Sequence, residues 1–287
     1  MKCELFEICL KLLIESGKYL RSLSLLAAVI VGEIFEVMLS EPLHILFIAL
    51  LLIVSFLYSS VGHGGASGYL ALMALFGMSP DIMKSSALVM NIFVSLIAFV
   101  GYYKAGFFQL KLFLPFAITS IPASFLGAYM TVDALLYKRI LGFILIFPIL
   151  RLTGLFGKEP QEKKLLNTYL ALMIGAAIGF LSGMIGIGGG IILSPIILLL
   201  HWGNMKETAA LSALFILVNS ISGLAGILSI GVAIDPSVFI WVGAVVIGGF
   251  AGTYFATTKF TNPTLKKILA FVLLIASVKL LTITDNK

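Results

Sequence analysis

Charged side chains are scarce in this chain of 287 residues: Asp, Glu, Lys and Arg make up 11% of it, whereas hydrophobic residues make up 60%. A soluble domain carries about 25% charged residues. The mean hydropathy is +1.14, so the composition excludes an ordinary soluble domain and indicates a polytopic membrane protein. The formal net charge of +6 does not point to a nucleic-acid partner, because an excess of Lys and Arg in membrane proteins marks cytoplasmic loops.

Cysteine is nearly absent, since Cys3 and Cys9 are the only two in the chain. They offer neither a disulfide framework nor metal-ligand spacing, so we expect no metal. The sequence also has no histidine pair on one helix, no Gly-x-Ser-x-Gly motif and no paired carboxylates inside an apolar segment. These absences disfavour an intramembrane enzyme, and no cofactor is expected. Residue 191 is isoleucine rather than the glycine that a dinucleotide motif beginning at Gly186 would need.

The chain does contain a series of apolar runs, most of them close to the roughly 20 residues that a membrane-spanning helix needs. We therefore expect an all-α polytopic membrane protein, preceded by a short amphipathic surface helix at 2–15. The two runs that begin near residues 65 and 189 are clearly shorter than the others. The eleven runs lie at about 22–39, 43–59, 65–79, 84–103, 110–131, 134–152, 166–182, 189–203, 207–230, 237–257 and 264–283.

The last ten runs form two copies of five. The sequence Gly62-His63-Gly64-Gly65-Ala66 returns 124 residues later as Gly-Ile-Gly-Gly-Gly, and Met83-Lys84 returns 122 residues later as Met-Lys. Chance similarity between two apolar stretches is the alternative, but the order of the matches never changes along the chain. We expect N-terminal helices at 1–42, a first transport repeat at 43–152, a cytoplasmic linker at 153–165 and a second transport repeat at 166–283.

An odd number of segments in each copy predicts that the copies have opposite orientations in the membrane. This is the inverted-repeat architecture of secondary transporters, whose site lies at the repeat interface near the midplane. If all eleven runs span, 14 of the 19 Lys and Arg residues fall on one side and 5 on the other. The split becomes 11 to 8 if the two short segments are re-entrant, and 10 to 9 if residues 22–39 do not span. The charges favour eleven spans, in the cell membrane, with a cytoplasmic N-terminus.

The two glycine clusters are the candidate working site. Each glycine inside a helix costs roughly 1 kcal/mol relative to Ala, and irregular backbone at membrane depth is tolerated only where it is buried in protein or lines a cavity. A helix that begins at the midplane presents unpaired N–H groups and about half a positive charge, so it can bind an anion. The alternative is that the glycines only allow close helix packing. The expected backbone contacts are Gly64, Gly65, Ala66, Ser67, Gly188, Gly189 and Gly190.

Polar side chains on the helices that follow the short segments could add hydrogen bonds. Ser212 and Asn219 share one helical face with Thr208, and Asn91 belongs to a comparable stripe in the first copy. We expect Asn91, Ser212 and Asn219 to be substrate donors, although hydrogen bonding between helices is an equal alternative.

Two further features lie near these clusters. His63 is the titratable group inside a glycine loop and could couple transport to protons, although a loop histidine is more often an ordinary hydrogen-bonding residue. Pro122 and Gly248 lie within apolar runs. We interpret them as hinge or packing points rather than ligands.

Each copy combines Gly-x-Gly-Gly-Gly or Gly-x-Gly-Gly-Ala with a short helix and then a helix rich in Ala, Ser and Thr. This pattern resembles the sulfite exporter TauE/SafE family, also called the TSUP family of membrane transporters. The resemblance covers about residues 43–283, and it is weaker in the first copy, where Ala66 replaces a glycine and His63 occupies the variable position.

The resemblance implies a membrane transporter, in the direction of export, for a small sulfur-containing or organic anion such as sulfite or a sulfonate. The expected partners are this anion and the lipid bilayer, with no nucleic acid. A homo-oligomer is compatible with the sequence. A passive anion channel of the same architecture is the alternative function, because both can be built from half-helices.

Overall fold

The computed structural model describes residues 42–59, 64–130, 132–152, 163–258 and 263–282. The predicted surface helix at 2–15, the run at 22–39, His63 and most of the linker lie outside the described residues. The chain divides into two compact units, residues 1–47 and 48–287. Of the first, the structure describes the helical residues 42–47, and the arrangement below is that of the second.

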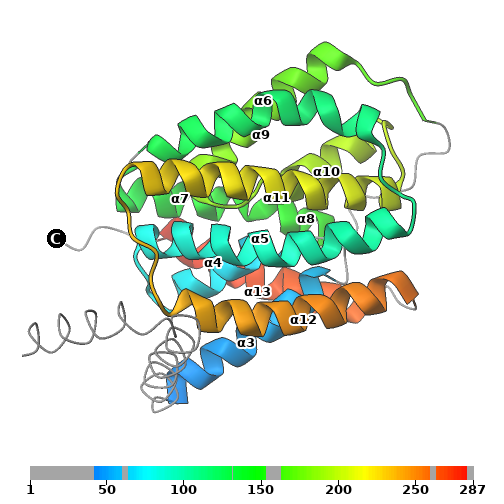
Figure 1. Ribbon diagram of the computed structural model, residues 1–287. Coiled ribbons are helices and arrows are strands. Elements are labelled where there is room, and N and C mark those ends of the chain that lie inside the picture. Colours follow the sequence, from blue (N-terminus) through cyan, green and yellow to red (C-terminus); the bar gives the residue numbers. More distant parts are fainter. Residues whose placement is uncertain (1–41, 60–63, 131, 153–162, 259–262, 283–287) are drawn as a thin grey trace, which may run out of the picture. The chain divides into compact units, whose positions relative to one another are not determined.

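Throughout the described ranges, all regular structure is helical, as predicted (Figure 1). The helices are α3 (Pro42–Ser59), α4 (Ala66–Leu75), α5 (Pro80–Lys104), α6 (Leu110–Tyr129), α7 (Ala134–Ile144), α8 (Ile146–Leu152), α9 (Thr168–Ile185), α10 (Gly190–Leu199), α11 (Met205–Ser229), α12 (Val238–Thr258) and α13 (Pro263–Thr282). By length and composition, six of the described helices can cross a membrane: α3, α5, α6, α9, α11 and α12.

The helices after the glycine clusters are too short to cross a membrane alone. Both α4 and α10 have 10 residues, which corresponds to a length of about 15 Å. The hydrocarbon core of a bilayer is about 30 Å thick. The expectation that all eleven runs span is therefore wrong for these two.

The run predicted as one segment at 134–152 is divided into α7 and α8, which meet at Leu145. Pro148 explains the division. A proline inside a helix has no N–H to donate, and its ring clashes with the carbonyl group four residues earlier. That carbonyl belongs to Ile144, the last residue of α7.

Equivalent helices of the two copies run antiparallel at the centre of the second unit. The start of α5 meets the end of α11, because Leu88 and Ile227 share one buried cluster. The end of α5 meets the start of α11, because Tyr102 and Ala209 share another. We name these two ends of the α5–α11 pair the Lys84 end and the Lys206 end. The antiparallel arrangement, visible in the colours of Figure 1, is consistent with inverted repeats.

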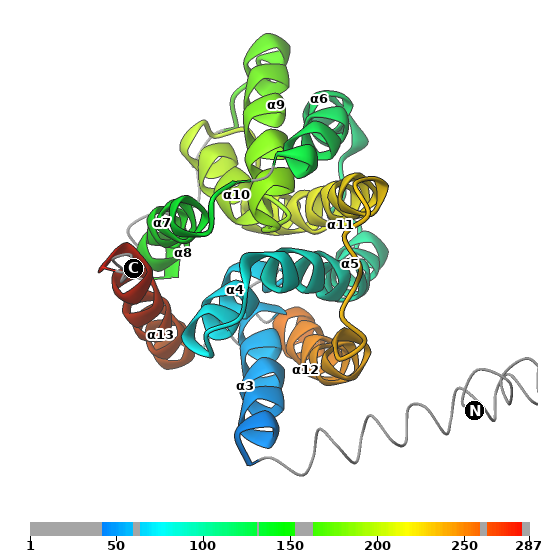
Figure 2. The ribbon, with the colours of Figure 1, turned by 90° about the vertical axis from the view of Figure 1, so that its left-hand side faces the viewer.

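The two copies exchange helices. Helix α9 of the second copy packs on α6 of the first (Figure 2), and a Cβ atom added to Gly183 of α9 would lie 1.8 Å from the carbonyl oxygen of Ser124. In the corresponding pair, α12 of the second copy packs on α3 of the first, where a Cβ at Gly248 would lie 2.3 Å from the carbonyl oxygen of Leu52. Side chains at these glycines would separate the helices. The interpretation of Gly248 as a packing point is confirmed.

The short helix α10 turns back toward the end at which α9 began. Lys163, just before α9, forms an ion pair with Glu207 in the first turn of α11, with Nζ and Oε1 2.6 Å apart. After α10, the carbonyl of His201 accepts a hydrogen bond of 2.8 Å from the amide of Lys164. Thus α9 and α10 begin and end at the Lys206 end. A returning hairpin places the following helices on the same sides as two full spans would, so the predicted grouping of Lys163 with Lys206, away from Lys84, is retained.

Candidate functional site

The glycine loops turn the chain through backbone angles that other residues rarely adopt. Gly65, the N-cap of α4, has φ 90°, and Gly189, the N-cap of α10, has φ 75°. Gly186 and Gly188 have φ 89° and 71°. These values lie in the left-handed region, which glycine adopts without steric cost because it has no Cβ. The glycine motif therefore fixes where both short helices begin.

Neither short helix has a side-chain cap at its start. By contrast, α7, α9 and α11 are capped by Asp133, Asn167 and Asn204. The first intrahelical bonds of α4 and α10 run from Gly68 to Gly65 and from Ile192 to Gly189, so the preceding amides have no partner in the helix. These amides belong to Ala66, Ser67, Gly190 and Ile191.

The two loops meet at Ile216 of α11. A Cβ atom at Gly64 would lie 3.2 Å from Cγ2 of Ile216, and a Cβ atom at Gly188 would lie 2.7 Å from the same methyl carbon. Both glycines also lie against the side-chain amide of Asn91 in α5, with its Oδ1 3.3 Å from the Gly64 position and its Nδ2 3.0 Å from the Gly188 position. The two glycine loops thus lie close together, and the centre between them is formed by Ile216 and the side chain of Asn91.

Buried polar atoms without partners surround this centre. Among the described residues, neither side-chain amide atom of Asn91 has a hydrogen-bond partner, and the hydroxyls of Ser220 and Ser182 have none either. All three residues are fully buried. The Ser220 hydroxyl lies 3.2 Å from the Cβ position at Gly188, and Cβ of Ser182 lies 3.4 Å from that at Gly189. Leaving such a group unsatisfied costs about 1–3 kcal/mol, which a ligand with complementary atoms would recover.

Two of the predicted side-chain donors already use their hydrogens within the protein. The Ser212 and Ser194 hydroxyls are 2.6 Å apart, and because Ser194 donates to the carbonyl of Gly190, Ser212 is the donor to Ser194. Asn219 donates through Nδ2 to the Ser120 hydroxyl at 3.1 Å and to the carbonyl of Phe215 at 2.8 Å. Its Oδ1 has no partner.

The remaining predicted residues stand at the start of α4. Gly65 and Ala66 form its N-cap and first position. The hydroxyl of Ser67 lies 2.7 Å from that of Tyr58. Ser220 and Ser182, which contact the second loop, were not predicted from the sequence.

The side chains closest to Gly64 and to the range 188–190 are all neutral. The aliphatic part of Lys84 reaches the start of the second loop, where its Cγ lies 3.2 Å from the position of a Cβ at Gly186. Among the described residues, no group of three His, Cys, Asp or Glu side chains could hold a metal ion. Helix amides, a side-chain amide and hydroxyls form a set of neutral donors, which suits an anion.

Comparison with known proteins gives one family. The family model for the sulfite exporter TauE/SafE matches residues 46–280. A probable membrane transporter protein of Sinorhizobium fredii is 36% identical over 236 residues, which cover 80% of this chain and 94% of that protein. A probable membrane transporter protein of Bacillus subtilis is 27% identical over 225 residues, which cover 76% of this chain and 90% of that protein. No solved structure matches the chain.

Proposed function

This chain belongs to the sulfite exporter TauE/SafE family, and we propose that it transports a small oxyanion, bound between its two glycine loops. The loops are residues 62–65, of which Gly64 and Gly65 are described, and residues 186–189. The relatives named above are membrane transporters by name. The multi-pass helical fold with its spanning helices agrees with that role.

The observation that carries the proposal is the meeting of Gly64 and Gly188 at one methyl group of Ile216, beside the unpartnered amide of Asn91. Two uncapped helix starts and a buried donor supply positive potential and hydrogen bonds at one point. Close packing alone would account for the glycines, but it does not account for a buried amide with four unused hydrogen-bonding positions.

The neutral donors around the loops support an oxyanion as the substrate class. Neutral N–H and O–H groups can surround an oxyanion without forming a permanent ion pair, so the ion can be released again. Sulfite or a sulfonate, which the family name suggests, has three oxygens for several donors at once. An inside-negative potential favours outward movement of an anion by about 2.3 kcal/mol per charge per 100 mV, so export would need no coupling ion.

Alternating access would open this point in turn toward the Lys84 end and the Lys206 end of the α5–α11 pair. The loops come from different copies, so a movement of one copy against the other would change which end is open. A passive channel would use the same donors without such a movement.

Counterflow in proteoliposomes tests the proposal. Vesicles loaded with unlabelled sulfite should accumulate labelled sulfite transiently and in a saturable way. Flux that rises linearly with concentration and shows no counterflow would indicate a channel. A thermal-shift screen against sulfite, thiosulfate, sulfate, sulfonates and carboxylates should show stabilisation by the substrate through mass action. Stabilisation by none of the oxyanions, together with no counterflow, would overturn the proposal.

A further inference from the structure

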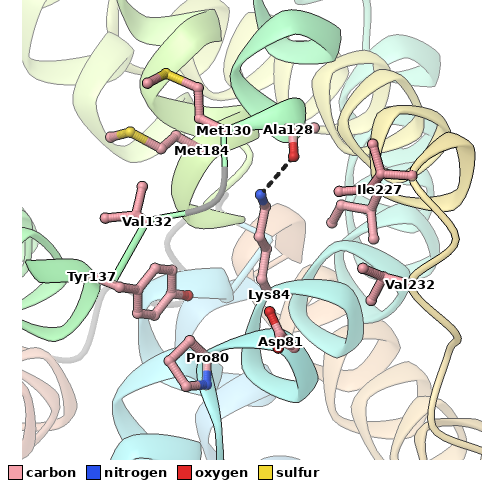
Figure 3. Close-up of a pocket in the computed structure, with 11 residues that line it drawn as sticks. Pro80, Asp81, Lys84, Ala128, Met130, Val132, Tyr137, Met184, Ile227 and Val232 are labelled. Atoms are coloured by element: carbon pink, nitrogen blue, oxygen red, sulfur yellow. Dashed lines mark hydrogen bonds between the residues drawn. The ribbon is translucent and has the colours of Figure 1, made fainter. Parts of the chain in front are cut away.

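A second feature suited to an anion lies at the Lys84 end, outside the glycine loops. It is a cavity of about 80 Å³ lined by residues of α5, α6, α7, α9 and α11 and of the adjoining connections (Figure 3). A water molecule needs about 10–15 Å³ of such space. The cavity therefore has room for several waters or for one ion of four or five heavy atoms.

Lys84 extends from α5 across this cavity, and its Nζ donates a hydrogen bond of 3.0 Å to the carbonyl of Ala128 near the end of α6 (Figure 3). An ammonium group has three N–H donors, and in the part of the chain that the structure describes this is its one hydrogen bond. Asp81 lines the same cavity but is exposed and forms no ion pair with Lys84. Two N–H donors of the Lys84 ammonium group are thus available to a ligand, beside the carboxylate of Asp81.

The cavity adjoins the second glycine loop, since Met184, two residues before Gly186, lines it. The main chain of Lys84 lies against Gly186, with its carbonyl oxygen 3.0 Å from the Cβ position of that glycine. Tyr137, on the opposite wall, donates a hydrogen bond of 2.7 Å to the carbonyl of Ile185. An ion in the cavity would therefore be next to the residues that lead to Gly188.

The equivalent lysine of the second copy is placed differently. Lys206 stands over the ring of Phe107, 4.8 Å from its centroid, where a cation–π interaction occupies its charge. The adjacent Glu207 is buried and accepts hydrogen bonds from Gln109, Lys163 and Asn204. A lysine with unused N–H donors beside a cavity is therefore found at the Lys84 end of the α5–α11 pair, whereas the charge of Lys206 at the other end is occupied by Phe107.

We propose that the Lys84 cavity is a second, outer binding site for a small oxyanion, through which the ion reaches or leaves the glycine loops at the Lys84 end. The inference rests on the proposed function for the class of ion and for the passage to the glycine loops, whereas binding at Lys84 can be tested without it. A cation in a partly enclosed site attracts anions and raises their local concentration. The site should weaken as salt rises, since salt screens a charge that is only partly buried.

The test counts the ions that the purified protein binds, with [35S]sulfate as the probe and sodium chloride to set the ionic strength. The wild-type protein should bind sulfate at Lys84, and Lys84→Met, which keeps the aliphatic chain, should lower the number of bound ions by one or raise that Kd at least tenfold. Lys84→Arg should restore binding. Asp81→Asn, which removes the nearby negative charge, should tighten binding.

The controls separate this inference from the proposed function and from a structural role. Asn91→Leu should leave sulfate binding at Lys84 intact. If this variant also shows normal counterflow, the result counts against the site between the glycine loops and not against the Lys84 site. If Lys84 only caps the end of α6, Lys84→Met will lower the melting temperature and leave sulfate binding unchanged. That result, or a wild-type protein that binds no sulfate at millimolar concentration, would overturn the second site.

Discussion

The side-chain amide of Asn91 lies against Gly188, with its Nδ2 3.0 Å from the position that a Cβ atom there would occupy. The contact joins a helix of the first copy to the glycine loop of the second. Within the ranges that the structure describes, neither amide atom has a hydrogen-bond partner, so no hydrogen bond between described helices accounts for this contact. Asn91 therefore ranks first among the predicted side-chain donors, because Ser212 and Asn219 already donate their hydrogens within the protein.

Asn91→Leu should impair transport without harming stability. The substitution removes a donor that the bound anion would use, at a cost of about 1–3 kcal/mol in binding, which is roughly a 5- to 150-fold rise in KM. The melting temperature should stay constant or rise, because an unsatisfied buried group is replaced by an apolar one. Counterflow of labelled sulfite and thermal unfolding measure the two effects.

Asn219→Leu is the matched comparison. Its Nδ2 bonds to Ser120 and to the carbonyl of Phe215, so its loss should lower stability by about 0.5–1.5 kcal/mol for each hydrogen bond. Full transport by Asn91→Leu, together with loss of transport in stably folded Asn219→Leu, would place the anion at Asn219 instead.

Gly64→Ala should narrow the meeting point of the loops. The φ angle of Gly64 lies outside the left-handed region, and the added methyl would stand 3.2 Å from Ile216 and 3.3 Å from Asn91. These contacts are with side chains that can shift slightly, so the fold should persist while anion affinity falls at least tenfold. Thermal-shift titration with sulfite measures the affinity.

The control for that variant is Gly243→Ala in α12, because nothing lies within 4 Å of its Cβ position. Gly248, interpreted from the sequence as a hinge or packing point outside the site, is an unsuitable control because a Cβ there would lie 2.3 Å from the carbonyl oxygen of Leu52. Equal sulfite affinity in Gly64→Ala and Gly243→Ala would mean that the space between the loops is not the binding site.

Ser220→Ala should reduce transport more than it reduces stability. The hydroxyl has no protein partner, so the folded protein loses nothing that it uses, whereas the anion loses a donor worth about 1 kcal/mol. Ser222→Ala on the same helix is the control, because its hydroxyl donates to the carbonyl of Ile121 at 2.6 Å. That variant should melt at a lower temperature and retain its KM. The reverse pattern in the two variants would contradict the assignment of Ser220.

Glu207→Ala should destabilise the Lys206 end. The carboxylate is buried and accepts hydrogen bonds from Gln109, Lys163 and Asn204, and it completes a capping box with Asn204. We expect a loss of about 1–3 kcal/mol. Lys163→Ala should cost less, about 0–1 kcal/mol, because that side chain is 49% exposed. Chemical denaturation that ranks the two variants in the opposite order would contradict this account.

Single cysteines test the topology. In a variant without Cys3 and Cys9, Lys164→Cys should resist a membrane-impermeant maleimide added to intact cells, because the charge distribution predicts a cytoplasmic linker. Arg139→Cys, an exposed position in α7, should react. Labelling of position 164 from outside would reverse the orientation.

Most of the fold was predictable because a bilayer allows few structures to long apolar segments. The runs at 84–103 and 207–230 correspond to α5 (Pro80–Lys104) and α11 (Met205–Ser229) within a few residues. The break between α7 and α8 was missed because the run was treated as a whole, whereas Pro148 acts on the single carbonyl of Ile144. Which helices exchange between the copies cannot be obtained from periodicity, since it depends on surfaces that meet only in three dimensions.

The glycine loops could be predicted from the sequence because they depend on backbone conformation. The side chains that face them were harder to predict, because they depend on how each helix is turned about its axis. Glycine at positions 65 and 189 is required by the left-handed angles there, so the motif locates the loops. Successive residues of a helix differ in direction by about 100°. Asn219 therefore bonds to Ser120 on α6, whereas its neighbour Ser220 contacts Gly188, and a stripe of polar residues read from the sequence could not separate the two.

The exchange of helices has a consequence for biosynthesis. When the first copy has been inserted into the membrane, α9 and α12 have not yet been made. The surface of α6 that later packs on Gly175, Gly179 and Gly183 of α9 therefore still faces lipid, and the surface of α3 that later packs on α12 does so too. Neither half can complete its own packing, so folding of the first copy is finished only when the second has been inserted. A gene cut within the linker should therefore yield two fragments that are unstable when expressed singly and that accumulate when produced together.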